Sequence, residues 1–188
     1  MGRATGSGRV AGAHVALLRG VNVGGRNSVS MELVAGAFTE LGCGEVRTYI
    51  QSGNVVFRAP RELADRLPEL AAERIARGAG LRPAVLVRSA EALRKVVRGN
   101  PYGGASESAA LHVAFLEDAP APRLVAQLDA GRSPPDSFVV RGSEIYLHCP
   151  NGMGRTRLSG AYFESRLETG VTVRNWRTVL ALLEMTGA

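Results

Sequence analysis

The spacing of apolar and polar residues predicts an alternation of short strands and amphipathic helices in the first half of the chain. Apolar runs of four to eight residues are typical of strands, and recurrence every three or four residues is typical of helices. The expected elements, in order, are a strand over 14–18, a helix over 31–41 between Ser30 and Gly42, a hairpin over 46–57 turning at Ser52-Gly53, a helix over 61–77 and a strand over 83–87. The resulting order is β-α-β-β-α-β.

The second half repeats this order, with a helix added at each end. The expected elements are a helix over 90–97 behind Ser89, a strand over 111–116, a short helix over 122–128, a hairpin over 137–149 turning near Gly142-Ser143, a helix over 159–167, a short strand over 171–173 and a helix over 176–185 behind Asn175. Two compact plaits with antiparallel sheets are therefore expected in tandem, an α+β fold. They span 13–88 and 89–188, after a flexible tail over 1–12. The turn-rich segment 99–108 is the best candidate for a linker or exposed loop.

This topology also predicts which loops lie together. In such a plait the first two strands run the same way, joined by a right-handed crossover. The end of the first strand and the turn after the second therefore share one edge of the sheet. Residues 19–27 should lie beside 51–54, and residues 150–157 should lie beside 174–176.

The two loops of this prediction also carry the most suggestive chemistry. LLRGVNVGGRN (17–27) and PNGMGRTR (150–157) both combine glycines and asparagine with arginine. Arginine forks and free backbone N–H groups near a helix start suit an anion. The alternative is that the glycines and asparagines merely form tight turns. The candidate ligand-binding residues are Arg19, Asn22, Gly24, Gly25, Arg26, Asn27, Gln51, Ser52, Asn54, Asn151, Gly152, Gly154, Arg155, Thr156, Arg157, Arg174 and Asn175. Neither loop matches a Walker A loop or a G-x-G-x-x-G fingerprint.

Composition narrows the class of partner without naming it. The 188 residues carry a formal net charge of +6, which favours anionic partners, whether nucleotide, nucleic acid or phosphorylated metabolite. An apolar content of 45% is enough for a sizeable core. Two cysteines make no disulfide framework, the first dozen residues contain no signal peptide, and no apolar run reaches membrane-spanning length. We therefore expect a cytoplasmic protein without membrane contact.

Catalytic groups are sparse. His14, His112 and His148 all fall in expected strands, and none has a partner four residues away. Cys149 follows His148, but adjacent strand residues point to opposite faces. No cluster of metal-ligating residues is apparent, so no metal is expected, and the sequence leaves the identity of any cofactor unknown. Trp176 is expected to anchor the last helix in the core.

Four segments together resemble a known bacterial family. These are LLRGVNVGGRN (17–27), TYIQSGNVVF (48–57), YLHCPNGMGRTR (146–157) and TVRNWRTV (172–179). They are similar to the domain-of-unknown-function family 1697. The resemblance implies two ferredoxin-like plaits and brings no established activity. Val173 stands where a hydroxyl residue is usual, and Arg157 where lysine is common.

The leading hypothesis is a protein that binds an anionic, phosphate-containing ligand at the Gly/Asn/Arg-rich loops. Three alternatives stay open: a small-molecule enzyme using the same loops, a binder of nucleic-acid phosphates, and a structural or partner-binding module. RNA-recognition plaits stack bases on aromatic residues of the central strands. The expected first strand has none, which argues against RNA on the sheet face.

Overall fold

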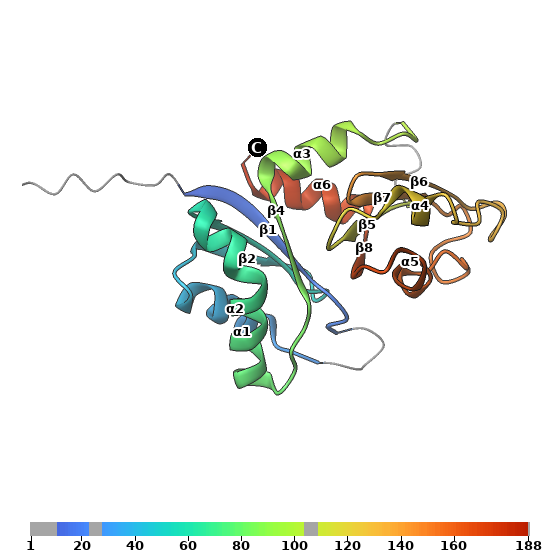
Figure 1. The fold of residues 1–188 in the computed structure, drawn as a ribbon. Helices are drawn as coiled ribbons and strands as arrows, with labels where there is room; N and C mark the ends of the chain where they lie inside the picture. Colours follow the sequence, from blue (N-terminus) through green and yellow to red (C-terminus); the bar gives the residue numbers. More distant parts are fainter. Residues whose placement is uncertain (1–10, 23–27, 104–108, 188) are drawn as a thin grey trace, which may run out of the picture.

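Two four-stranded antiparallel sheets and six helices form an α+β fold in the computed structural model, which describes residues 11–22, 28–103 and 109–187 (Figure 1). The predicted tail over 1–12 therefore lies almost wholly outside the described residues, and segment 99–108 is described only to Gly103. Apart from small shifts at their ends, the predicted helices and strands are confirmed in order and type.

The first sheet has the strand order β2-β3-β1-β4. Its half of the chain comprises β1 (Gly12–Leu18), α1 (Met31–Glu40), β2 (Gly44–Tyr49), β3 (Asn54–Ala59), α2 (Arg61–Ala79) and β4 (Val85–Ser89). Strand β1 is central and alternates between two cores, because Ala16 and Leu18 face α1 and α2 while Val15 and Leu17 face the other side.

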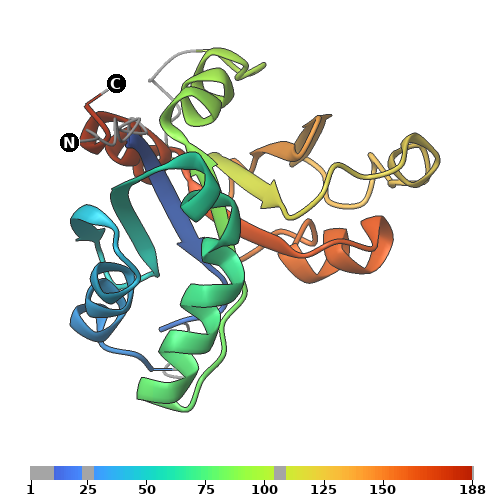
Figure 2. The same cartoon turned by 60° about the vertical axis from the view of Figure 1, so that its left-hand side comes forward.

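The second sheet repeats this arrangement with the order β6-β7-β5-β8. Its half comprises α3 (Ala90–Arg98), β5 (Leu111–Leu116), α4 (Pro122–Val125), β6 (Ser137–Arg141), β7 (Glu144–His148), α5 (Gly160–Leu167), β8 (Val171–Asn175) and α6 (Trp176–Met185). Helix α5 packs on β8 and on α4, covering the outer face of this sheet. Figure 2 shows α5 and α1 on opposite sides of the molecule.

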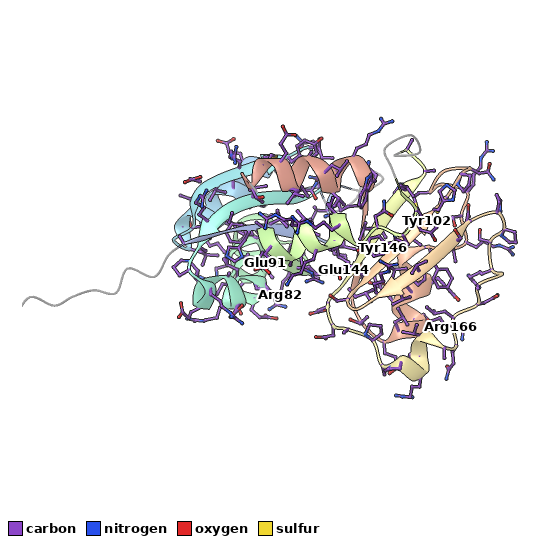
Figure 3. The ribbon with its side chains drawn as sticks, turned by 90° about the horizontal axis from the view of Figure 1, so that it is seen from above. Arg82, Glu91, Tyr102, Glu144, Tyr146 and Arg166 are labelled. Atoms are coloured by element: carbon purple, nitrogen blue, oxygen red, sulfur yellow. The ribbon has the colours of Figure 1, made fainter. Side chains whose placement is uncertain are left out.

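Helices α3 and α6 form a layer between the two sheets. They pack on each other, α3 also on β1 and β4, and α6 on β5, β8 and β3. One hydrophobic cluster runs through this layer from Val15 of β1 to Phe115 of β5. It includes Trp176, 5% exposed, so its predicted role as a core anchor is confirmed. Tyr146 of β7 reaches α3, where its hydroxyl donates to the carbonyl of Val96 over 2.9 Å (Figure 3).

Each of these two helices follows its strand without a loop. Ser89 ends β4, and its hydroxyl accepts a hydrogen bond from the N–H of Ala92 over 3.1 Å. Asn175 ends β8 in the same way, its side-chain oxygen accepting from the N–H of Thr178 over 2.8 Å. A polar N-cap residue at the strand end thus turns the chain straight into a helix. These two junctions fix the helices against the sheets.

Several predicted element ends differ from the structure by one to three residues. The strand expected over 83–87 begins at Val85 and runs to Ser89, and Pro83 has no N–H to give to a ladder. The helix expected over 122–128 ends at Val125, because 126–128 continue with tighter bonds such as that from the N–H of Leu128 to the carbonyl of Val125. The strand expected over 171–173 continues to Asn175, paired with β5. None of the described helices has the length and apolar character to span a membrane.

Candidate functional site

The loop after β1 is held by the turn between β2 and β3. The N–H of Leu18 donates to the carbonyl of Gly53 over 2.8 Å. The side chain of Asn22 donates to the carbonyls of Gln51 (2.8 Å) and Val29 (3.0 Å), and accepts from the N–H of Val29 (2.8 Å). The predicted proximity of this loop to residues 51–54 is therefore confirmed for the described residues. The side chain of Asn22 thus joins the loop to Val29 and to the turn at Gln51.

Gly53 allows the close approach of the turn to β1. Its φ is +73°, and a Cβ added there would lie 2.4 Å from Val21 Cγ2 and 2.8 Å from Leu18 Cβ. Real Cβ atoms do not come so near other carbon atoms. Any side chain at this position would both strain the backbone and push the loop away from the turn.

Arg174 of β8 enters this loop–turn contact from the other half of the molecule. It is 8% exposed, and all three nitrogens of its guanidinium donate to the protein. The acceptors are Asn54 Oδ1 (2.5 Å), Thr172 Oγ1 (2.7 Å), and the carbonyl oxygens of Leu18 (2.7 Å), Val173 (2.9 Å), Ser52 (3.1 Å) and Gly53 (3.3 Å). Arg174 thus joins the ends of β1 and β3 to β8.

The charge of Arg174 has no counterion among these contacts. All six acceptors are neutral amide, carbonyl or hydroxyl oxygens. Burial lowers the pKa of Arg174 to about 10, so the guanidinium stays charged at neutral pH. Buried charges in proteins are normally paired. A buried cation satisfied only by neutral dipoles keeps its surroundings electropositive.

Arg19 makes a second link between the halves. Its guanidinium lies 2.6 Å from Glu164 Oε2 in α5, and the side chains of the pair are 44% and 21% exposed. The other oxygen of Glu164 accepts from the N–H of Val171 over 3.0 Å. Arg19 therefore has its own carboxylate partner, unlike Arg174.

The second loop folds against the segment that precedes β6. The N–H of Arg157 and the hydroxyl of Thr156 both donate to Ser133 Oγ, over 3.0 and 3.4 Å. Gly152 and Arg155 close turns within the loop through backbone bonds of 2.9 and 3.1 Å. The side chains of Arg155 and Arg157 are exposed. Among the described residues, no side chain is hydrogen-bonded to either guanidinium.

The two loop edges meet at a cleft of about 320 Å³ between the halves. It is lined by Ile50, Ser52, His112, Met153, Val173, Arg174, Asn175 and Thr178. Because Met153 shares this cleft with Arg174 and Asn175, the predicted proximity of 150–157 to 174–176 is also confirmed. We call this space the junction cleft.

The polar groups of the junction cleft are few. Burial lowers the pKa of His112, so its imidazole is neutral at neutral pH. Ser52 Oγ accepts from the side-chain amide of Asn54 over 3.0 Å, which leaves the hydroxyl hydrogen to donate elsewhere. Asn175 is exposed and begins α6, whose positive dipole end adds to the charge of Arg174.

Ile50 is the most strained residue of the lining. Its φ is +48°, in the left-handed region that β-branched residues avoid, and it is 53% exposed. Strained backbone of this kind clusters at binding and catalytic sites. Ile50 presents an exposed apolar side chain to the cleft, together with Met153 and Val173.

The predicted candidate residues thus separate into four groups. Ser52, Arg174 and Asn175 line the junction cleft. Arg19, Asn22, Gln51 and Asn54 do not line it and are bonded within the protein. The second loop supplies Asn151, Gly152, Gly154, Arg155, Thr156 and Arg157, none of which lines the cleft. Gly24, Gly25, Arg26 and Asn27 lie outside the described residues.

Sequence reasoning missed five residues of the lining. Ile50, Met153, Val173 and Thr178 have side chains without distinctive chemistry, and His112 was set aside as a lone strand histidine. One signal was available for Ile50 and Met153, because both neighbour predicted loop residues. Within the described residues, no group of three or more His, Cys, Asp or Glu is placed to hold a metal.

Comparisons with known proteins identify relatives of the fold. The family model described as "Protein of unknown function (DUF1697)" matches residues 12–146. The solved structure of the conserved bacterial protein SP0830 from Streptococcus pneumoniae is similar, with a TM-score of 0.73 and 21% sequence identity, covering 94% of this chain and 99% of that chain. This likeness concerns the fold. No curated protein matched the sequence.

Proposed function

This chain belongs to the DUF1697 family, whose description assigns no activity, and from its geometry we propose that it binds a small anionic, phosphate-containing molecule in the junction cleft. The observation that carries the proposal is the charge of Arg174, which lines the cleft and is met only by neutral oxygens. The formal net charge of +6 adds to the attraction for an anion.

Arg174 would act on this ligand through its field rather than by contact. Its three nitrogens already donate to the protein. Direct contacts would come from the hydroxyl of Ser52, the side-chain amide of Asn175 and the N-terminal N–H groups of α6. The sequence predicted that Arg174 contacts the anion directly. We propose instead that it attracts the anion electrostatically without contacting it.

The apolar part of the lining defines the rest of the ligand. Ile50, Met153 and Val173 offer hydrophobic contact next to the polar groups. A volume of about 320 Å³ lies near the lower end of the range for small-molecule sites. These features support a phosphorylated metabolite or mononucleotide with an organic body. An enzyme acting on such a molecule would have His112 as the neutral base within reach.

A second candidate function, binding of nucleic-acid phosphates, is supported by Arg155 and Arg157. Both side chains are exposed on one loop beside Met153 of the cleft. A protein that neutralises phosphates loses affinity steeply as salt rises. A short single-stranded RNA, titrated at two salt concentrations, therefore belongs in the same binding screen.

The decisive test uses Asn175, because aspartate caps a helix as well as asparagine does. Asn175→Asp keeps the cap and adds a negative charge to the cleft, whereas Asn175→Ser keeps the cap without charge. With inorganic phosphate, a sugar phosphate and a nucleoside monophosphate as probes, we expect at least about tenfold weaker binding to Asn175→Asp than to Asn175→Ser. Asn151→Asp, exposed and outside the lining, is the matched control.

The readout is the ring signals of the histidines in ¹H–¹³C NMR spectra, since the chain has only three. Phosphate compounds should shift the signals of His112 and leave those of His148, which lies outside the cleft. If no probe shifts His112, or if Asn175→Asp binds as tightly as the serine variant, the proposal is wrong.

We also infer that each half is a ferredoxin-like plait. Both halves share the order β-α-β-β-α-β, and in each sheet the first and third strands of that order are central. The two cysteines, both buried and free, support the expected reducing cytoplasm.

A further inference from the structure

A second cavity lies far from the junction cleft, between the start of α2 and the start of α3. Its volume is about 650 Å³, within the range of sites that hold small organic ligands. The apolar part of the wall includes Ala64 and Pro68 of α2 and Val87 of β4. The polar part comprises His14, Arg61, Asp65, Arg88 and Ser89. We call this space the α2–α3 groove.

His14 is the notable group in this groove. It is 9% exposed, and its ring stacks on that of Phe57 with centroids 5.4 Å apart. Burial lowers the pKa of His14, and the nearby backbone carbonyl of Ala59 only partly opposes this effect. The imidazole is therefore neutral at neutral pH, and one of its two ring nitrogens is an acceptor. No donor to that nitrogen occurs among residues 11–22, 28–103 and 109–187.

Arg61 and the start of α2 lie at one end of the groove. Arg61 is the first residue of α2, and its side chain is 91% exposed, held only loosely by Asp65 at 3.7 Å. The N-cap residue of α2 is Pro60, which gives no side-chain cap to this helix of 19 residues. The helix dipole and Arg61 favour an acidic group there, whereas Glu62 and Asp65 of the same helix oppose it.

From this arrangement we infer that the α2–α3 groove binds a small organic acid with an apolar body and a hydroxyl or amine group. The donor group would bond to the free nitrogen of His14, the apolar body would lie against Ala64, Pro68 and Val87, and the acidic group would meet Arg61. The site is independent of the junction cleft and of the function proposed there.

The first experiment compares three aromatic acids that differ only in the donor. Para-hydroxybenzoate and para-aminobenzoate carry one, and benzoate does not. In ¹H–¹³C NMR titrations of the full-length protein, the donor-bearing acids should shift the ring signals of His14 and leave those of His112 and His148 in place. The same spectra thus separate this site from the junction cleft.

The second experiment changes the recognising groups. His14→Phe keeps an aromatic ring on Phe57 but removes the acceptor. The wild type should bind the donor-bearing acids about five- to tenfold more tightly than benzoate, the effect of one hydrogen bond, and this preference should vanish in His14→Phe. Arg61→Ala should weaken all three acids, whereas Arg66→Ala, exposed on the same helix and outside the groove, should weaken none.

Two results would overturn the inference. One is that none of the three acids shifts His14. The other is that the preference for a donor persists in the folded His14→Phe protein, because recognition would then not pass through the imidazole.

Discussion

Arg174 in β8 donates a hydrogen bond to Oδ1 of Asn54 in β3 over 2.5 Å, although 120 residues separate them along the chain. Asn54 is completely buried. The same guanidinium donates to the carbonyls of Leu18, at the end of β1, and of Gly53, just before β3. One side chain therefore joins both of these strands to the other half of the molecule. Arg174 is therefore a structural joint as well as the source of charge at the junction cleft.

Replacing Arg174 should destabilise the protein strongly. Arg174→Met removes every donor and leaves buried acceptors, including Asn54 Oδ1, without partners. We expect the free energy of unfolding to fall by about 3 kcal/mol or more, measured by urea denaturation. Arg155→Met, at an exposed arginine, should change it by less than about 0.5 kcal/mol. Equal urea midpoints for the two variants would contradict the assigned role.

Gly53→Ala and Gly142→Ala form a matched pair. Both glycines have positive φ, +73° and +60°, but only Gly53 faces atoms that a Cβ would strike. Gly142→Ala should cost about 1 kcal/mol for backbone strain alone. Gly53→Ala should cost about 2 kcal/mol more, because Val21 and Leu18 must move. Thermal or urea unfolding measures the difference in stability between the two variants. A similar loss of stability in both would contradict the prediction, because the turn would then accommodate the added methyl group at little cost.

Substitutions at Leu182 and Leu180 measure how much the helix layer between the sheets contributes to stability. Both lie on α6, but Leu182 is 1% exposed within the shared core and Leu180 is 37% exposed. Leu182→Ala should lower the free energy of unfolding by about 3 kcal/mol, and Leu180→Ala by less than about 1 kcal/mol. Fluorescence of Trp176, the only tryptophan, and far-UV circular dichroism should report the same midpoint. Separate midpoints would show that the halves unfold independently.

The pH dependence of stability should reflect His14 and His112. Burial lowers the pKa of both from the usual 6.5. Between the folded pKa and 6.5 the unfolded chain binds more protons, so stability is full above 6.5 and is lost as the pH falls through that window. Urea midpoints at pH 7.5 and 5.5 should differ less for His14→Phe/His112→Phe than for the wild type. An unchanged difference would contradict this origin.

Local rules explain what the sequence could predict. Element order follows from periodicity, and the helix starts after Ser30, Ser89 and Asn175 follow from N-cap chemistry, which involves residues only two or three apart. The sharing of one edge by 19–22 and 51–54 follows from topology. These features need no knowledge of how the halves meet.

The residues that form the candidate site, in contrast, could not be predicted without knowing how the two halves meet. Arg174 was predicted as a ligand contact, but three of its six acceptors are backbone carbonyls of the other half, which no motif encodes. Ile50 adopts positive φ without the glycine or asparagine that would signal it. His14 gains a role only because α2 and α3 enclose it in a groove. Tertiary contacts decide each of these three cases.

The layer of α3 and α6 makes this single chain resemble a closed homodimer. Helix α3 follows β4, the last strand of the first sheet, and packs on β1 and β4 of that sheet. Helix α6 follows β8, the last strand of the second sheet, packs on β5 and β8 of that sheet, and meets α3 between the two sheets. Such a reciprocal arrangement is that of an isologous interface between two protomers. A ligand held between the halves would then occupy the equivalent of a subunit boundary, where both copies of the repeated unit contribute, yet with different side chains from each.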